Sequence, residues 1–474
     1  MAEVSPNKQQ QKLIEGTKGI YLVDAGAGTG KTFTITRRYV ELLDEGYEPE
    51  DIFLCTFTRN ASDEMTERIV EKTDLDPARL YEAPISTFHS HCQKILQKHG
   101  FNAPNILGIN DNITEDISVM ESQIRERQEF EEFYESFRQQ KTEYSDFFSI
   151  ISDESDILDL LKSLAAKGVI PGEEGWYGKT EKYLDGDEQR FKELFEDANK
   201  PVKENGNNQQ SRLRGRLNSM RYKTYPEDAP EPEEVRGGYG TKTVRMDFSR
   251  KAFQEDREQL KHFIHNIYYE YLKYCLSRNY LNFSFLMMFT YVLLHQKEHV
   301  RKQESFSHLM IDEFQDTNEI QFKLTLLLAK KDNICVVGDW KQSIYSFQYT
   351  TVENIQEFEE RLNRYCNELN NDEIRVKFDI DEVNQVKLNM NYRSTQDILD
   401  FSEKSLELPG NRYEKVKTPE ITSLESQKTY QQSDIRKLLT ENETDSVLGK
   451  IQEVVNNEQY LHEDDGERKK LDYE

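Results

Sequence analysis

The chain has 474 residues and a formal net charge of −26, with 36% apolar and 11% aromatic residues. This composition excludes a globally disordered chain, and the length predicts about three domains. Taken alone, the negative net charge argues against a nucleic-acid partner. Nucleic-acid binding, however, depends on where basic residues cluster and not on the net charge.

Cysteine usage and hydropathy indicate the compartment. Five cysteines are scattered without a CxxC pattern, and Cys55 and Cys335 lie in apolar runs, so we expect reduced, buried thiols. The N-terminus lacks a hydrophobic signal core, and no apolar run reaches the length of a membrane span. We therefore expect a soluble, cytoplasmic protein with no membrane partner.

The pattern of elements predicts an α/β domain that is interrupted by an insertion. Residues 1–105 alternate strand-like runs, such as IYLVDA and DIFLCTFT, with amphipathic helical segments. Residues 106–279 change to long, charged helical patterns, which predict an inserted, mostly helical domain. Strand patterns resume in SHLMIDE and NICVVGD, so residues 280–385 complete the α/β domain, and residues 386–474 begin a third region.

The insertion contains a cluster of aromatic residues and a cluster of basic residues. Aromatic residues recur at helical spacing and predict a packing face: Phe130, Phe133, Tyr134 and Phe137. A basic run stands out in an acidic chain and is either a solvated face or a contact to duplex DNA: Arg212, Arg214, Arg216, Arg221 and Lys223.

The segment AGAGTGKT follows a predicted strand and opens a predicted helix, which is the context of a phosphate-binding loop. Its small residues allow backbone N–H groups to close around phosphate oxygens. Lys31 would reach the β and γ phosphates, and the Thr32 hydroxyl would join a Mg²⁺ shell. The nucleotide-binding residues predicted here are Ala25, Gly26, Ala27, Gly28, Thr29, Gly30, Lys31 and Thr32. The alternative is a simple glycine-rich turn.

A second motif, MIDEFQD, ends a predicted buried strand with adjacent carboxylates. Asp312 is expected to hold Mg²⁺ and Glu313 to orient and deprotonate water, which indicates hydrolysis of a nucleoside triphosphate. Alone, the motif is equally compatible with an acidic strand end that faces solvent.

The phosphate loop, DEFQD, GDWKQSIYSF and NYRS occur in the order seen in superfamily 1 DNA helicases of the UvrD/Rep type, which this chain resembles. The resemblance implies a RecA-like P-loop NTPase with a parallel sheet, the helical insertion and a partial second motor domain. It implies that Gln10 reads adenine and that Gln315 relays the nucleotide state. It also implies that Gln342 and Arg393 contact the γ-phosphate.

Loop residues just past the predicted strand ends are expected to contact DNA, through aromatic rings that stack bases and donors that bind phosphates. The residues are Phe57, Thr58, Arg59, Thr87, Phe88, His89, Tyr345 and Phe347. For any single ring the alternative is a half-buried packing role.

The predicted function is that of an ATP-dependent DNA helicase or translocase that acts on single-stranded DNA and on junctions with duplex DNA. The resemblance implies 3′ to 5′ movement, with ATP and Mg²⁺ as cofactors. Nothing after Arg393 matches the family's later motifs, so two alternatives stay open. One is a nucleotide-responsive DNA-binding module without turnover. The other is the motor of a RecB-like helicase–nuclease, in which a partner supplies the nuclease or the second motor half.

Overall fold

The computed structural model describes residues 5–148, 151, 153–184, 257–343, 350–380, 382–406, 423–427, 449, 461–464 and 467–470. The chain divides into two units, Met1–Asn389 and Met390–Glu474.

The first unit is built on a six-stranded sheet in which every pairing is parallel. Its spatial order is β10 (Val383–Leu388), β1 (Ile20–Ala25), β9 (Ile334–Gly338), β8 (His308–Ile311), β2 (Ile52–Cys55) and β3 (Ile85–Ser86). Strands β2, β8 and β9 are buried at every position, as expected for parallel strands that are covered on both faces. The predicted α/β fold class is therefore confirmed.

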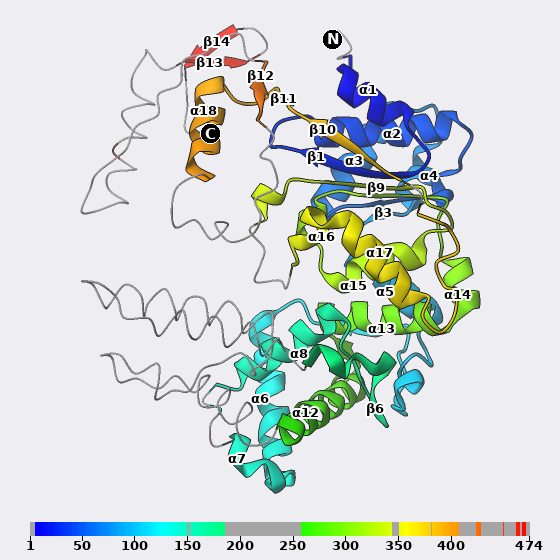
Figure 1. Ribbon diagram of the computed structural model, residues 1–474, viewed down its shortest axis with the longest axis vertical. Helices are drawn as coiled ribbons and strands as arrows, with labels where there is room; N and C mark the ends of the chain where they lie inside the picture. The colour runs from blue at the N-terminus through cyan, green and yellow to red at the C-terminus, as the bar shows by residue number, and fades with distance from the viewer. Residues whose placement is uncertain are drawn as a thin grey trace. The chain divides into compact units, whose positions relative to one another are not determined.

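Helices surround this sheet and form the insertion (Figure 1). Those before the insertion are α1 (Lys8–Glu15), α2 (Lys31–Asp44), α3 (Arg59–Val70), α4 (Pro77–Glu82) and α5 (Phe88–His99). The insertion carries α6 (Gln123–Gln140), α7 (Ser145–Phe148), α8 (Ser155–Lys167) and α12 (Arg257–Ser277). After it come α13 (Phe283–Gln296), α14 (Glu298–Gln303), α15 (Glu319–Leu328), α16 (Glu353–Gln356) and α17 (Phe358–Leu369).

Short elements connect these helices and strands. Two-residue strands pair as β4 (Ser118–Val119) with β7 (Tyr280–Leu281), and as β5 (Pro171–Gly172) with β6 (Gly175–Trp176). The 3₁₀ turns are η1 (Pro49–Asp51), η2 (Pro104–Leu107), η3 (Thr142–Tyr144), η4 (Tyr177–Leu184), η6 (Phe314–Asp316) and η7 (Trp340–Gln342).

Helix α13 joins the sheet layer to the insertion. Its residues from Ser284 to His295 are all buried, and a helix that is apolar on every side belongs in a core. It packs against α5, α8 and α15 (Figure 1). The described residues of 106–279 fall in the same compact unit as the sheet.

The aromatic stripe on α6 is a packing face, as predicted. Phe130, Phe133, Tyr134 and Phe137 are all buried. Phe130 meets Tyr271 of α12 edge-on with 4.8 Å between ring centroids, and Phe133 lies 5.0 Å from the same ring. All five cysteines are free and buried, which confirms the prediction of buried thiols.

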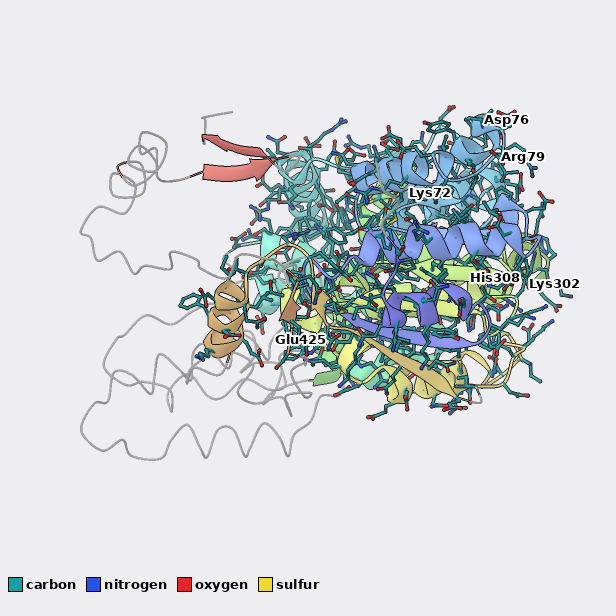
Figure 2. The ribbon with its side chains drawn as sticks, turned by 90° about the horizontal axis from the view of Figure 1, so that it is seen from above. Lys72, Asp76, Arg79, Lys302, His308 and Glu425 are labelled. Carbon is teal, nitrogen blue, oxygen red and sulfur yellow. The ribbon has the colours of Figure 1, made fainter. Side chains whose placement is uncertain are left out.

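Strand β8 carries polar groups at both ends. At its start, His308 (labelled in Figure 2) is buried, and its ring packs edge-on against Tyr47 with 4.3 Å between centroids. Burial lowers the pKa of this histidine to about 4, so the ring is neutral at pH 7. At the other end of the strand lie the carboxylates of the DEFQD motif.

The second unit begins later than the predicted boundary at residue 385. Strand β10 pairs with β1 through Leu388, so the sheet retains residues that the sequence analysis assigned to the third region. Its described elements are β11 (Met390–Asn391), α18 (Gln396–Leu406), β12 (Glu425–Ser426), β13 (Leu461–Asp464) and β14 (Glu467–Lys470). In the described part of the chain, no helix combines the length and the apolar character that a bilayer span needs.

Candidate functional site

The phosphate loop lies between β1 and α2, as predicted. Gly28 and Gly30 have positive φ angles of 73° and 81°, which only glycine adopts readily. The Thr29 hydroxyl donates to the Gly26 carbonyl at 2.8 Å and closes the turn. Lys31 is the first residue of α2, so the helix N-terminus points its positive end at the loop.

Gln10 ties the start of the chain to this loop. It completes a capping box on α1, in which its Oε1 accepts a hydrogen bond from the Asn7 backbone at 2.9 Å. Its Nε2 donates to the Thr29 carbonyl at 3.1 Å, and the residue is 2% exposed. Each end of the carboxamide thus has one partner in the protein, and a carboxamide retains one further N–H donor and one further acceptor lone pair for an adenine contact.

Asp312 and Glu313 follow β8 directly. Asp312 is 8% exposed, and its buried Oδ1 has no hydrogen-bond partner among the described residues. Burial, with the Glu313 carboxylate as a second cause, raises the pKa of Asp312 to about 7. A buried carboxylate oxygen without a donor, beside a glycine-rich phosphate loop, is the ligand chemistry that Mg²⁺ requires.

Glu313 adopts a left-handed backbone conformation, with φ 51° and ψ 44°, which is uncommon for a residue with a side chain. Its Oε2 accepts from Lys31 Nζ at 2.8 Å, and the two side chains are 33% and 11% exposed. The predicted base and the predicted phosphate-binding lysine are therefore paired with each other.

The Gln315 carboxamide extends this contact toward the neighbouring strand. Its Nε2 donates to Glu313 Oε2 at 2.8 Å, and its Oε1 accepts from the Asp339 backbone at 2.9 Å. Asp339 Oδ2 in turn accepts from Gln342 Nε2 at 2.7 Å. Gly338 makes room for this arrangement, because a Cβ there would lie 2.4 Å from Gln315 Oε1. The chain of contacts from Lys31 through Glu313, Gln315 and Asp339 to Gln342 is called the sheet-edge network below.

Two other predicted nucleotide contacts lie outside this network. Thr32 is half-buried in the first turn of α2. Arg393 belongs to the second unit, where its side chain is exposed and its backbone N–H donates to Asn391 Oδ1 at 2.9 Å.

The predicted DNA-binding residues lie at two helix starts. Thr58 is the N-cap of α3 and accepts from the Ala61 backbone at 3.2 Å, and Thr87 caps α5 through Ser90 at 3.2 Å. Arg59 is exposed and forms an ion pair with Glu121 at 3.0 Å. Tyr345, Phe347 and the basic run from Arg212 to Lys223 lie outside the described residues.

The rings near these helix starts differ in exposure. Phe57 is half-buried, whereas Phe88 is 4% exposed and packs edge-on against Phe53. In this conformation Phe88 has no free face for a base, so it fits the packing alternative. Burial lowers the pKa of His89 to about 4, and its ring lies 4.5 Å from that of Phe283. His89 is thus a neutral ring at pH 7 and not a positive charge.

A cavity of about 450 Å³ includes residues from both sides of the site. Its lining contains Phe57 and His89 together with Asp312 and Glu313. The insertion contributes Met120, Glu121, Gln123, Glu126 and Lys162, which the sequence analysis did not assign to a site, and α13 contributes Phe283.

A buried network supports the insertion side of this cavity. Glu126 is 4% exposed, pairs with Lys162 at 2.9 Å, and accepts from Asn282 Nδ2 at 2.7 Å. Asn282 also caps α13, where its Oδ1 accepts from the Phe285 backbone at 2.8 Å. An aspartate at this position would place a second carboxylate against Glu126, which explains why an amide stands before Phe283.

Residues 6–363 match the family described as the UvrD/REP helicase N-terminal domain. The chain is similar to the ATP-dependent DNA helicase PcrA of Staphylococcus aureus strain Mu50, at 26% identity over 83% of this chain and 38% of the relative. It is similar to the PcrA helicase of Bacillus subtilis strain 168, at 27% identity over 86% of this chain and 40% of the relative. The chain thus spans about two fifths of the length of the curated relatives that it matches.

Proposed function

Because the chain belongs to the family described as the UvrD/REP helicase N-terminal domain, we propose that it is the ATP-binding part of a superfamily 1 DNA helicase or translocase. It binds ATP with Mg²⁺, hydrolyses ATP in response to single-stranded DNA, and moves 3′ to 5′ along the strand, including at junctions with duplex DNA. The observation that carries this proposal is the sheet-edge network, because it connects the phosphate loop to the loop of Gln342.

The residues at the end of β1 and β8 fit a magnesium-bound nucleotide. The glycines of the loop carry no side chain that would cover its backbone, and Asp312 Oδ1 lacks a donor among the described residues. Held by Asp312 and the Thr32 hydroxyl, Mg²⁺ would neutralise charge on the β and γ phosphates.

Four side chains of the chain then have separate roles in hydrolysis. Lys31 exchanges its partner Glu313 for phosphate oxygens, which frees the Glu313 carboxylate to orient water and accept its proton. Gln342 is proposed as a donor to the γ-phosphate. Gln315 transmits the displacement of Glu313 to Asp339, because it bonds both residues.

On the strand side, the N-termini of α3 and α5 point their positive ends at this region, and the exposed Thr58 hydroxyl is a donor for a DNA phosphate. Phe57 and the neutral His89–Phe283 pair offer ring faces for bases. Phe88 supports these groups from the core side, where it contacts Phe53.

The experiment is ATP hydrolysis by this chain with and without a single-stranded oligonucleotide. We expect DNA-stimulated turnover that falls about 10³-fold in Lys31→Ala, because the principal cation of the phosphate site is lost. The matched control is Lys302→Ala, which removes an exposed lysine (labelled in Figure 2) whose ion-pair partner in the described part of the chain is Glu298 on its own helix. Binding of ATP and DNA without turnover would instead support the nucleotide-responsive binding module.

A further inference from the structure

Lys341 places a buried ammonium group between the ends of two neighbouring strands. Its side chain is 11% exposed, and its Nζ lies 3.2 Å from Asp339 Oδ1 and 4.0 Å from Asp24 Oδ1. The Trp340 ring covers it, with 5.7 Å from Nζ to the ring centroid. An ammonium group in such a place is a weak source of stability, because desolvation offsets much of the attraction. The position of this ammonium group is therefore more informative about its role than its contribution to stability.

The two carboxylates come from the strands on either side of the nucleotide site. Asp24 is the last residue but one of β1, directly before the phosphate loop, and it stands in register with Gly338 of β9. Asp339 follows β9 and begins the turn that carries Gln342. Lys341 thus bridges the strand that leads into the phosphate loop and the turn of the proposed γ-phosphate contact. Lys387 of β10 lies beside Asp24 in register, so this carboxylate faces a second lysine.

The Asp339 carboxylate contacts three groups on two residues, Lys341 and Gln342. Oδ1 accepts the Lys341 backbone N–H at 3.1 Å and pairs with Lys341 Nζ, whereas Oδ2 accepts from Gln342. The position of the Lys341 charge therefore restrains the carboxylate that orients the Gln342 carboxamide.

We propose that Lys341 is a positioning residue for Gln342, which it holds in register with the phosphate loop through Asp339 and Asp24. This role rests on the proposed function only for its consequence in hydrolysis; the positioning itself is a property of the nucleotide-free protein. Lys341 Nζ lies within hydrogen-bonding distance of Asp339 Oδ1, whereas its 4.0 Å distance to Asp24 Oδ1 is too long for a hydrogen bond. One more methylene in Asp24→Glu would bring the carboxylate closer to Nζ.

The kinetic test uses Lys341→Met, Gln342→Ala and the double variant, with a single-stranded oligonucleotide as activator. We expect Lys341→Met to lower kcat about tenfold with KM for ATP within about twofold, which is the signature of a group that acts on the transition state. The double variant should be no slower than Gln342→Ala, because both changes remove one contribution. Lys341→Arg should restore most of the turnover and Asp24→Glu should retain it, whereas Asp24→Asn should lose part of it.

Independent effects of Lys341→Met and Gln342→Ala, multiplying in the double variant, would overturn the proposal. A loss of kcat that follows the melting temperature across these variants would overturn it as well. Lys302→Met is the control for removing a lysine as such, since its ammonium group is exposed.

Hydrogen exchange of the nucleotide-free protein separates this inference from the proposed function. In Lys341→Met, the amides of residues 339–343 should exchange faster than in the unmodified chain, while those of β2 should not change. If exchange at 339–343 is unaltered, the positioning role is wrong, whether or not the chain hydrolyses ATP. If the unmodified chain shows no turnover, the proposed function fails and exchange alone decides the role of Lys341.

Discussion

The nucleotide side and the strand side of the same sheet edge are built in contrasting ways. On the nucleotide side, short polar contacts join residues from Lys31 to Gln342. On the strand side, the cavity combines half-buried rings with two helix starts, and Glu121 of its lining forms an exposed ion pair with Arg59.

This difference indicates which existing contacts each ligand has to replace when it binds. ATP has to exchange existing contacts, above all the Lys31–Glu313 pair, so its binding changes the protein by necessity. In the proposed function, a DNA strand would add contacts to rings and N–H groups without breaking the sheet-edge network. Because coupling between two ligand sites is reciprocal, an effect of ATP on DNA affinity requires an equal effect of DNA on ATP affinity.

The largest expected effect is on the nucleotide side. Glu313→Gln should reduce hydrolysis about 10³-fold, because the amide cannot accept a proton from water. It should also tighten ATP binding, because Lys31 no longer has a carboxylate that competes with phosphate. Turnover and binding of a fluorescent ATP analogue measure the two effects. Weaker ATP binding in this variant would show that the Lys31–Glu313 pair does not oppose the nucleotide.

An intermediate effect is expected on the strand side. Phe283→Ala should weaken binding of a labelled single-stranded oligonucleotide about tenfold, because one stacking face contributes about 1–3 kcal/mol. Affinity for ATP should not change, since Phe283 has no part in the sheet-edge network. Phe101→Ala is the matched control, because that ring is 55% exposed and lies outside the cavity lining. Equal losses in both variants would contradict a specific role for Phe283.

The smallest effect concerns the pH dependence of stability. Burial raises the pKa of Asp316 from 3.8 to about 6, with the Glu313 charge as a second cause. Between these values the folded state binds more protons than the unfolded state, so the free energy of unfolding falls as the pH rises through this window and then levels off.

Asp316→Asn should therefore remove part of that slope and raise the melting temperature by about 2–4 °C at pH 8, with a smaller gain at pH 4.5. Thermal melts of the nucleotide-free protein across this range provide the measurement. Asp116→Asn, which removes an exposed carboxylate, should leave the profile unchanged. A variant at Asp316 that is destabilised at pH 8 would show that the carboxylate is favourably bound there.

The sequence allowed the nucleotide-side segments to be placed at one edge of the sheet because each of them is contiguous with a strand. AGAGTGKT, DEFQD and GDWKQ each place their side chains by following a buried strand, and parallel strands bring those ends together. The bond from Gln10 to Thr29 was not predicted, because it joins the first helix to a loop nineteen residues away.

The strand side was predicted less completely for physical reasons. The Glu126–Asn282 contact joins residues 156 positions apart, and no local pattern encodes that distance. A ring that follows a strand end can be buried in the core or stay partly exposed, and Phe88 is buried whereas Phe57 is half-buried. Strands β10 and β11 are separated by one residue, so nothing in the local pattern marked the boundary of the first unit.

The central claim is that the sheet-edge network couples the nucleotide state to the grip on the strand. Its most direct test is the affinity of Gln342→Ala for a labelled single-stranded oligonucleotide, measured with and without ATP and Mg²⁺. The account predicts that the unmodified chain changes its DNA affinity when ATP is added, and that the variant binds DNA as well without ATP but no longer responds to it. A variant that loses DNA binding while it retains the response to ATP would contradict the account.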